Sequence, residues 1–218
     1  MAGTITGVSP ERTGAARALS ERWLDPLRST LGAYQRRTVR VPERRKAAVM
    51  IPLFERDGQP WVVLTRRTDQ VRTHKGQISF PGGTHDAADE DLWATAVRET
   101  HEELGLDPSA AAYIGTLDDY PTFASGFIVT AFVASIEPPD AWRPSEVEID
   151  EVIELPLAGL AGIGRVEVWE REGIRFPMSI FELDGHYVWG VTAFILRQFL
   201  DVIGSALGYP TPVGRTEP

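Results

Sequence analysis

The chain has 218 residues, enough for one domain of generous size and too few for two large ones. Hydrophobic residues make up 43% and charged residues 24%, a globular composition that excludes disorder as the main state. No cysteine occurs, which excludes a disulfide scaffold, a thiolate zinc site, an iron–sulfur cluster and a cysteine nucleophile. The lack of cysteine also fits a reducing compartment, so we expect a cytoplasmic protein.

Charge is unevenly distributed along the chain. Bases exceed acids by six over residues 1–47 and by two over residues 48–85, whereas acids exceed bases by 17 over residues 86–218. The net charge of −9 argues against a nucleic-acid partner. A basic first part and an acidic remainder suit a polyanionic small molecule that a divalent metal bridges to carboxylates. The longest apolar run, around Val188–Leu196, is far shorter than the roughly 20 residues of a membrane span, so we expect no membrane partner.

The first elements are a helix and a hairpin. Apolar residues at every fourth position over Ala15–Leu31 predict an amphipathic helix, which we expect Pro26 to split. Residues 1–34 are therefore interpreted as an N-terminal helical extension of a main domain over residues 35–218. The apolar runs Ala47–Phe54 and Trp61–Thr65 are separated by the turn-forming residues 56–59, a pattern that predicts two strands joined as a hairpin.

Downstream, residues 66–85 form a segment rich in loop residues, and residues 89–104 are predicted to be a helix with acids in its first turn and Gly105 as its stop. The later predicted elements are four strands and a closing helix, over Phe123–Val133, Val152–Leu155, Val166–Trp169, Ser179–Leu183 and Trp189–Ile203. Strands interspersed with a few helices, without a regular βαβ repeat, indicate a mixed-sheet α+β or α/β layer fold.

Three glutamates share one face of the helix expected over residues 89–104. At about 100° per residue, Glu102 and Glu103 fall within roughly 60° of Glu99. Mg²⁺ or Mn²⁺ would offset the repulsion between them, because carboxylate and phosphate oxygens are the ligands these ions prefer. The alternative is a solvated acidic face with Arg98 as a local counter-ion. The Gly82-Gly83 turn and the basic loop before the helix favour the metal site, because they would place phosphate-binding groups beside it.

The same segment closely resembles the signature of the Nudix hydrolase family, Gly-x5-Glu-x7-Arg-Glu-U-x-Glu-Glu-x-Gly-U, in which U is aliphatic. Residues 98–106, Arg-Glu-Thr-His-Glu-Glu-Leu-Gly-Leu, match its second half except at Thr100. Counting back from Arg98 places Glu90 at the first acidic position, whereas counting forward from Gly83 places Asp89 there. Both assignments remain open at this stage.

A narrower resemblance lies upstream. Residues 64–67 (Leu-Thr-Arg-Arg) and 74–83 (His-Lys-Gly-Gln-Ile-Ser-Phe-Pro-Gly-Gly) are similar to the additional motif of the coenzyme A pyrophosphatase branch. The likeness covers residues 35–203. It implies an α/β/α sandwich with a mixed β-sheet between helices. It also implies metal-dependent hydrolysis of the pyrophosphate of coenzyme A or its derivatives, which gives 4′-phosphopantetheine and adenosine 3′,5′-bisphosphate.

The resemblance implies roles for particular residues. Glu99, Glu102 and Glu103 would hold Mg²⁺ or Mn²⁺, Arg98 would orient a carboxylate, and either Glu99 or Glu148 would serve as general base. The residues expected to bind the substrate, including the 3′-phosphate of coenzyme A, lie in the basic loop and the glycine turn; they are Arg66, Arg67, Arg72, His74, Lys75, Gly76, Gln77, Gly82 and Gly83.

Two other functions compete with this one. The chain could be a Nudix hydrolase of another dinucleotide, such as ADP-ribose, NADH or a diadenosine polyphosphate. It could also be a Nudix-fold module that senses a nucleotide without cleaving it, although three clustered glutamates disfavour a pure sensor. The expected partner in each case is a small nucleotide, and a homodimer is left open.

Overall fold

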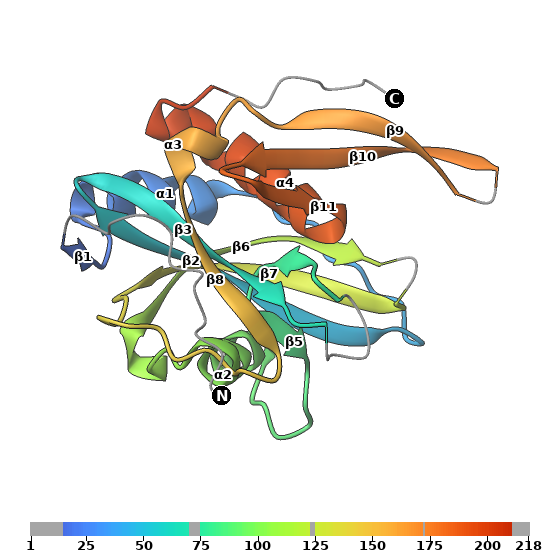
Figure 1. Cartoon of the computed structure of the whole chain (residues 1–218), viewed down its shortest axis with the longest axis horizontal. Helices are drawn as coiled ribbons and strands as arrows, with labels where there is room; N and C mark the ends of the chain where they lie inside the picture. The colour runs from blue at the N-terminus through green and yellow to red at the C-terminus, as the bar shows by residue number, and fades with distance from the viewer. Residues whose placement is uncertain (1–14, 70–74, 123–124, 172, 211–218) are drawn as a thin grey trace, which may run out of the picture.

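The computed structural model describes residues 15–69, 75–122, 125–171 and 173–210. A mixed β-sheet lies at the centre, one helix covers one face, and the other helices with a small second sheet cover the opposite face (Figure 1). This architecture confirms the predicted α/β/α layer fold with a mixed sheet between helices. The helices are α1 (Glu21–Ala33), α2 (Leu92–Leu104), α3 (Leu157–Leu160) and α4 (Gly190–Leu207), and a 3₁₀ turn covers Pro108–Ala110.

The central sheet contains eight of the described strands. They are β1 (Ala16–Arg17), β2 (Arg45–Arg56), β3 (Gln59–Arg67), β4 (Ile78–Ser79), β5 (Gly82–Thr84), β6 (Ala111–Pro121), β7 (Phe127–Ile136) and β8 (Ile149–Pro156). Strand β2 is its axis: it pairs in parallel with β7 and antiparallel with β3 and β5. Strands β9 (Arg165–Arg171), β10 (Ile174–Leu183) and β11 (His186–Trp189) form the second sheet.

The predicted hairpin is present as β2 and β3. Its connection is Asp57-Gly58, and both residues have positive φ, 52° and 71°. Two consecutive residues of positive φ define the type I′ turn, whose twist matches that of paired strands. Asp-Gly is among the sequences that adopt this turn at least cost, so the local sequence fixes the position of the turn.

The sheet separates two hydrophobic cores, because successive side chains of a strand point to opposite faces. On β2, Ala47 and Ile51 belong to the core under α1 and α4, whereas Ala48 and Met50 belong to the core under α2. Any residue of β2 can therefore be assigned to one face by its position relative to these four. The helix with the three glutamates covers the face of even-numbered β2 residues.

Helix α1 differs from the prediction in two ways. It begins at Glu21, because residues 16–17 pair with β2 as β1, and it continues through Pro26 without a break. A proline inside a helix costs about 3 kcal/mol. Burial of Trp23, Leu27 and Leu31 against the core contributes roughly 1.5–3 kcal/mol for each side chain. The burial outweighs the proline, so the helix stays in one piece.

Two other predictions need correction. Helix α2 starts at Leu92 rather than residue 89, with Asp91 as its N-cap and no acid in its first turn. Strand β6 was not predicted at all. Its sequence contains Gly115, Asp118 and Asp119, residues depleted in strands, and its pairing with β7 has two register shifts. Strand β6 is held by pairing with β7 rather than by its own propensity.

Helix α4 is 18 residues long with a mean hydropathy of 1.3, which is enough by length and composition to cross a membrane. The core helix of a globular domain meets the same criteria. In this fold α4 packs against α1 and β10, and its buried residues include Leu196, Phe199 and Ile203.

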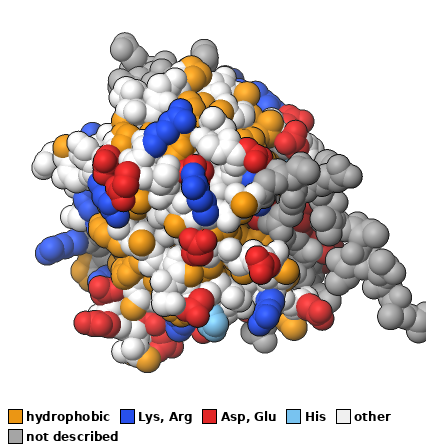
Figure 2. Space-filling view, turned by 90° about the vertical axis from the view of Figure 1, so that its left-hand side faces the viewer, with side chains coloured by type: hydrophobic (Ala, Val, Ile, Leu, Met, Phe, Trp, Pro, Cys, Tyr) orange, Lys and Arg blue, Asp and Glu red, His pale blue; other side chains and the backbone are white. Residues whose placement is uncertain are grey.

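Basic and acidic residues occupy different parts of the sequence but lie close together in the folded structure. Figure 2 shows red, blue and apolar side chains interspersed on the face turned to the viewer. Bases of the first 70 residues pair with distant acids: Arg17 with Glu55, Arg36 with Asp119, Arg56 with Glu154, Arg66 with Glu151, and Arg67 with Glu103 and Glu148. Much of the positive charge of this part of the chain is therefore neutralised by ion pairs within the protein.

The contact between α1 and β6 yields a prediction about stability. A Cβ at Gly115 would lie 2.6 Å from the Cβ of Leu31, whereas a Cβ at Gly32 would have nothing within 4 Å. Gly115→Ala should therefore lower the free energy of unfolding by about 1–3 kcal/mol through overpacking. The control Gly32→Ala should raise it by roughly 0.5 kcal/mol, because alanine favours the helix. Denaturant unfolding measures both, and an unchanged Gly115→Ala midpoint would contradict the close approach.

Candidate active site

Helix α2 is positioned by its two ends. The Asp91 carboxylate accepts a hydrogen bond from the Ala94 N–H at 2.8 Å, and Gly105 ends the helix in the left-handed conformation, φ 69°. These are a typical N-cap and a typical C-cap, and both are determined by the local sequence. The helix buries Ala96, Thr100 and Leu104 against the sheet. Glu103 consequently lies between the helix and the ends of β3 and β5, Glu99 lies against β5, and Glu102 is exposed.

Glu103 is the buried member of the three, with a side chain only 3% exposed. Arg67 Nη1 donates to its Oε1 at 2.9 Å, and the Gly82 N–H donates to its Oε2 at 3.2 Å. Burial raises the pKa of Glu103 to about 7, although Arg67 and the Gly82 N–H oppose the shift. The nearby charges of Glu99 and Glu148 raise it further. The carboxylates of Glu99, Glu103 and Glu148 therefore repel one another.

Glu99 lies directly over Gly83. A Cβ at Gly83 would overlap the carboxyl group of Glu99, so any side chain larger than hydrogen would displace the carboxylate. Burial is the main cause that raises the pKa of Glu99, and Arg98, which donates to its Oε1 at 2.9 Å, opposes it. Two of the three glycines predicted to bind substrate therefore contact carboxylates: Gly82 contacts Glu103, and Gly83 contacts Glu99.

Arg98 connects the acidic residues of this segment. Its Nε and Nη2 donate to both oxygens of Asp89 at 2.8 and 3.0 Å, and its Nη1 donates to Glu99 and Glu102 at 2.9 and 3.1 Å. These hydrogen bonds hold the pKa of Asp89 well below its ordinary value. Glu90 is exposed. Of the two acids left open by the sequence, Asp89 is the one that contacts Arg98.

The oxygen donors suit a hard divalent cation. Among the described residues, however, no group of three or more acidic or histidine side chains stands in a ready metal-binding arrangement. Arg67, Arg98 and the Gly82 N–H are hydrogen-bonded to the oxygens of Glu99, Glu102 and Glu103. Burial and mutual repulsion make Glu99 and Glu103 costly as bare anions, and an added positive charge would relieve both effects. The residues therefore fit such an ion chemically.

Consecutive arginines of β3 separate to opposite faces of the sheet. Arg67 reaches Glu103 and, at 3.2 Å, Glu148, on the side of α2. Arg66 pairs with Glu151 at 3.0 Å, and Glu151 also contacts His186 at 3.2 Å. Of the two, the structure brings Arg67 to the carboxylate cluster.

The rest of the predicted substrate loop follows β3. The Gly76 N–H donates to the Arg67 carbonyl, and the Arg67 N–H donates to the Gln77 carbonyl, so the loop returns to the end of β3. Lys75 and Gly76 are exposed. Arg72 and His74 lie outside the described residues.

Glu148 reaches the cluster from the segment before β8, with a side chain 48% exposed. The Thr68 N–H donates to the backbone carbonyl of Glu148 at 2.9 Å, which anchors that segment to the end of β3. Sequence reasoning named Glu148 but missed its anchor. The sequence did not decide whether Asp89 or Glu90 contacts Arg98. The only local indication was the number of residues between the acid and the arginine.

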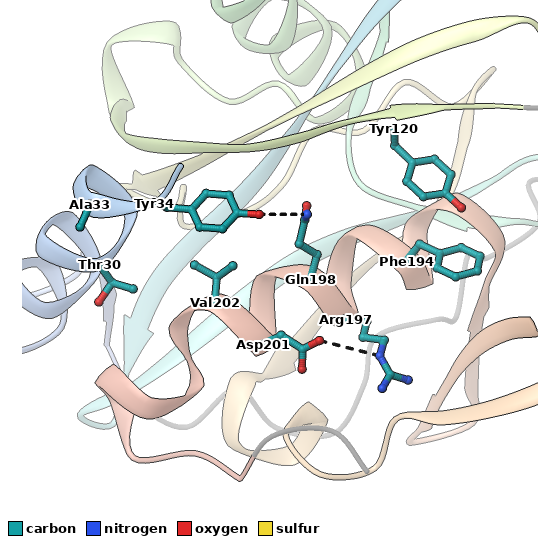
Figure 3. A pocket seen from close by; sticks show the side chains of 9 residues that line it. All are labelled: Thr30, Ala33, Tyr34, Tyr120, Phe194, Arg197, Gln198, Asp201 and Val202. Atoms are coloured by element: carbon teal, nitrogen blue, oxygen red, sulfur yellow. Dashed lines mark hydrogen bonds and ion pairs between the residues drawn. The ribbon is translucent and has the colours of Figure 1, made fainter. Parts of the chain in front are cut away.

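A separate cavity of about 690 Å³ lies across the sheet, between α1, β6 and α4 (Figure 3). The Tyr34 hydroxyl donates to Asp118 at 2.9 Å and accepts from Gln198 at 3.3 Å, while Tyr120 stacks on Phe194. Burial and the Asp118 carboxylate raise the pKa of Tyr34 to about 12. None of the predicted site residues that the structure describes lines this cavity.

Comparison with known proteins places this site in a family. The model of the NUDIX domain matches residues 44–174. Proteins named "Uncharacterized Nudix hydrolase NudL" from Salmonella newport and Salmonella enteritidis are 40% identical over 163 residues, which cover 74% of this chain and 84% of each relative.

Two solved structures are also similar. An Ap4A hydrolase from C. elegans aligns with 23% identity and a TM-score of 0.44, over 52% of this chain and 80% of its own. A MutT/nudix family protein from Enterococcus faecalis aligns with 13% identity and a TM-score of 0.47, over 80% of this chain and 71% of its own. The family model and the curated relatives carry the assignment: the chain belongs to the Nudix hydrolase family and is a hydrolase of a nucleoside diphosphate derivative.

Proposed function

We propose that this enzyme hydrolyses the pyrophosphate bond of coenzyme A or its derivatives, giving 4′-phosphopantetheine and adenosine 3′,5′-bisphosphate. The observation that carries the proposal is the contact of the Gly82-Gly83 turn with Glu103 and Glu99. This turn ends the upstream motif that resembles the coenzyme A branch. The motif and the glutamate helix therefore form one site, on which a diphosphate can meet both.

In the proposed reaction Glu99, Glu102 and Glu103 hold one or more divalent ions. Nudix hydrolases generally use divalent metal ions such as Mg²⁺ or Mn²⁺. When bound, such an ion neutralises pyrophosphate charge and lowers the pKa of water. Arg98 keeps the side chains of Glu99 and Glu102 oriented, and Asp89 keeps Arg98 in place.

The chemical step needs little covalent work from the protein. Water attacks one phosphorus in line, a new P–O bond forms, and the bond from that phosphorus to the bridging oxygen breaks. A carboxylate must accept the proton of the water. Glu99 and Glu148 are the candidates: Glu99 has a raised pKa, which favours proton uptake, and Glu148 is exposed enough to meet a substrate.

The residues proposed to contact the substrate fall into two groups, one at the carboxylate cluster and one in the loop after β3. Arg67 lies beside Glu103 and Glu148 and could meet the diphosphate. Lys75 and Gly76 are exposed at the end of the loop and could meet a more distant part of the substrate. Arg66 pairs with Glu151 on the face of the sheet opposite to the glutamate cluster, so we assign it the lesser part in binding. A nucleotide sensor without hydrolysis is disfavoured by the family assignment, and another dinucleotide remains the rival substrate.

A product assay on coenzyme A, NADH and ADP-ribose, each with Mg²⁺ and with Mn²⁺, tests the substrate. We expect coenzyme A to give the highest kcat/KM, with 4′-phosphopantetheine and adenosine 3′,5′-bisphosphate as products in equal amounts. A diadenosine polyphosphate serves as a fourth substrate. A higher kcat/KM for any of the other three would replace coenzyme A as the proposed substrate and leave the hydrolase assignment intact.

Glu103→Gln should lower kcat/KM by at least about 100-fold, since losing a metal ligand should cost at least as much as losing a partner of one. The fold should survive, because the glutamine oxygen can still accept from the Gly82 N–H and Arg67 retains Glu148. Turnover of the parent enzyme should stop in EDTA. The matched control is Glu146→Gln, an exposed acid. Full activity of Glu103→Gln with a native circular dichroism spectrum would refute its role.

Asp89 and Glu90 should differ sharply. Asp89→Asn weakens both charge-assisted bonds to Arg98, so we expect a loss of about 10–100-fold in activity, as for other residues that orient metal ligands. Glu90→Gln should change activity less than about twofold, because its side chain is exposed. Steady-state kinetics across a metal titration compares them, and Asp89→Asn should raise the metal concentration needed for half-maximal rate. Equal losses in the two variants would show that Glu90 also acts in the site.

A further inference from the structure

A small basic cavity lies at the start of β2, apart from the glutamate cluster. Its volume is about 180 Å³, and its lining includes three cations, Arg40, Arg44 and Lys46, with Val39 and Ile128 among its apolar residues. No acidic residue lines it among the residues that the structure describes. None of these cations belongs to the motifs singled out in the sequence. The cavity is thus an additional basic site to be explained.

The cavity opens on the same face of the sheet as the glutamates. Lys46 lies two residues before Ala48 on β2, so both side chains point to the α2 face, and Ala48 is part of the core under α2. Ala48 is paired with Gly83, over which the Glu99 carboxylate lies. Two residues span about 7 Å of strand. The ammonium-bearing residue is therefore a short step along β2 from the carboxylate cluster.

The cations of the cavity are available to an anion. In the described part of the chain, neither Arg40 nor Lys46 has an acidic side chain within ion-pairing distance, and both are exposed. Arg44 donates to the Thr122 carbonyl at 2.7 Å, a contact that fixes its guanidinium without neutralising it.

Asp119, on β6 beyond β7, does not supply that neutralisation, because other groups hydrogen-bond to its carboxylate. The carboxylate of Asp119 accepts from the Arg36 guanidinium, the Val39 N–H and the Thr130 hydroxyl at 2.6 to 2.9 Å. Its charge is therefore shared among three donors. Arg45, between the cations in sequence, stacks over Phe127 at 4.2 Å and takes no part in the lining.

The size of the cavity limits what it can hold. Whole drug-sized ligands occupy pockets of about 300–1,000 Å³, so 180 Å³ suits one group of a ligand rather than a nucleotide. We propose that the cavity formed by Arg40, Arg44 and Lys46 binds a phosphate monoester of the substrate, while the pyrophosphate of the same molecule lies at the glutamates.

This assignment rests on the proposed function and makes it more specific. In coenzyme A the 3′-phosphate and the 5′-pyrophosphate are attached to one ribose, so the two anionic groups are one sugar apart. Lys46 and Ala48, the residue paired with Gly83, are two residues apart on β2. This short separation matches the separation of the two anionic groups on one ribose. The 3′-phosphate is then held by the start of β2 instead of by the loop over residues 66–75, where Arg66 and Arg67 are paired with carboxylates.

Equilibrium binding without added metal tests the cavity directly. Adenosine 3′,5′-bisphosphate should bind the parent protein about 10- to 100-fold more tightly than adenosine 5′-monophosphate, the range expected for a well-formed charged contact. Arg40→Gln and Lys46→Gln should each reduce this ratio toward one. The matched controls Arg45→Gln and Arg37→Gln should keep it, because Arg45 faces the other core and Arg37 does not line the cavity.

The kinetic counterpart compares coenzyme A with dephospho-coenzyme A. The kcat/KM ratio should favour coenzyme A in the parent and fall in Arg40→Gln and Lys46→Gln, but not in the two controls. Thermal melting of every variant confirms that each is folded. No preference for the bisphosphate in the parent, or an equal loss in Arg45→Gln, would overturn the proposal. Inorganic phosphate as a competitor separates a site for any phosphate from one that needs the attached nucleoside.

The two proposals fail in distinguishable ways. If the bisphosphate preference depends on Arg40 and Lys46 but coenzyme A is not hydrolysed, the cavity stands and the proposed substrate is wrong. If coenzyme A is hydrolysed without any preference over dephospho-coenzyme A, the proposed function stands and the cavity has no part in it.

Discussion

The candidate site depends on a single buried charge, the carboxylate of Glu103. A carboxylate removed from water is strongly destabilising unless it is paired and hydrogen-bonded. Here the compensation comes from the Arg67 guanidinium on β3 and the Gly82 N–H on β5. The helix, the strand and the glycine turn must therefore come together before Glu103 can be buried. Burial raises the pKa of Glu103 despite these two contacts, so another positive charge beside the carboxylate would stabilise it further.

The Gly82-Gly83 turn also helps to accommodate the buried carboxylates. Because Gly82 contributes its N–H and Gly83 has no Cβ, two carboxylates of α2 can lie against the backbone of β5. Arg98 adds a second set of contacts around Glu99 and Glu102, and Asp89 holds Arg98 from outside the helix. The acidic cluster is thus held by backbone, by two arginines and by an acid that contacts one of them.

The alternation of side chains across the central sheet gives sequence neighbours different tasks. Arg66 and Arg67 pair with acids on opposite faces, and Arg45 and Lys46 separate in the same way. Pairing with distant acids is a second reason why the basic first third of the chain does not become a single basic surface. Arg17, Arg36 and Arg56 are used in pairs with acids from elsewhere in the chain. The net charge of a sequence segment therefore says little about the charge of the protein surface that the segment forms.

The sequence by itself determined the features that depend on near neighbours. The Asp57-Gly58 turn, the helix of the three glutamates and the layer fold followed from turn chemistry, helical spacing and the order of elements. Only the tertiary structure decided that β6 is a strand, that Asp89 holds Arg98, that Gly83 lies under Glu99, and that Arg40 and Lys46 share a cavity. Strand β6 depends on its pairing with β7, and the contact of Gly83 with Glu99 depends on the packing of α2 against β5. The Asp89–Arg98 contact depends on where α2 begins, and the cavity of Arg40 and Lys46 is closed by Ile128 of the paired strand β7. Local pattern does not specify which strands pair or in what register, and both are settled by how the two cores pack across the sheet.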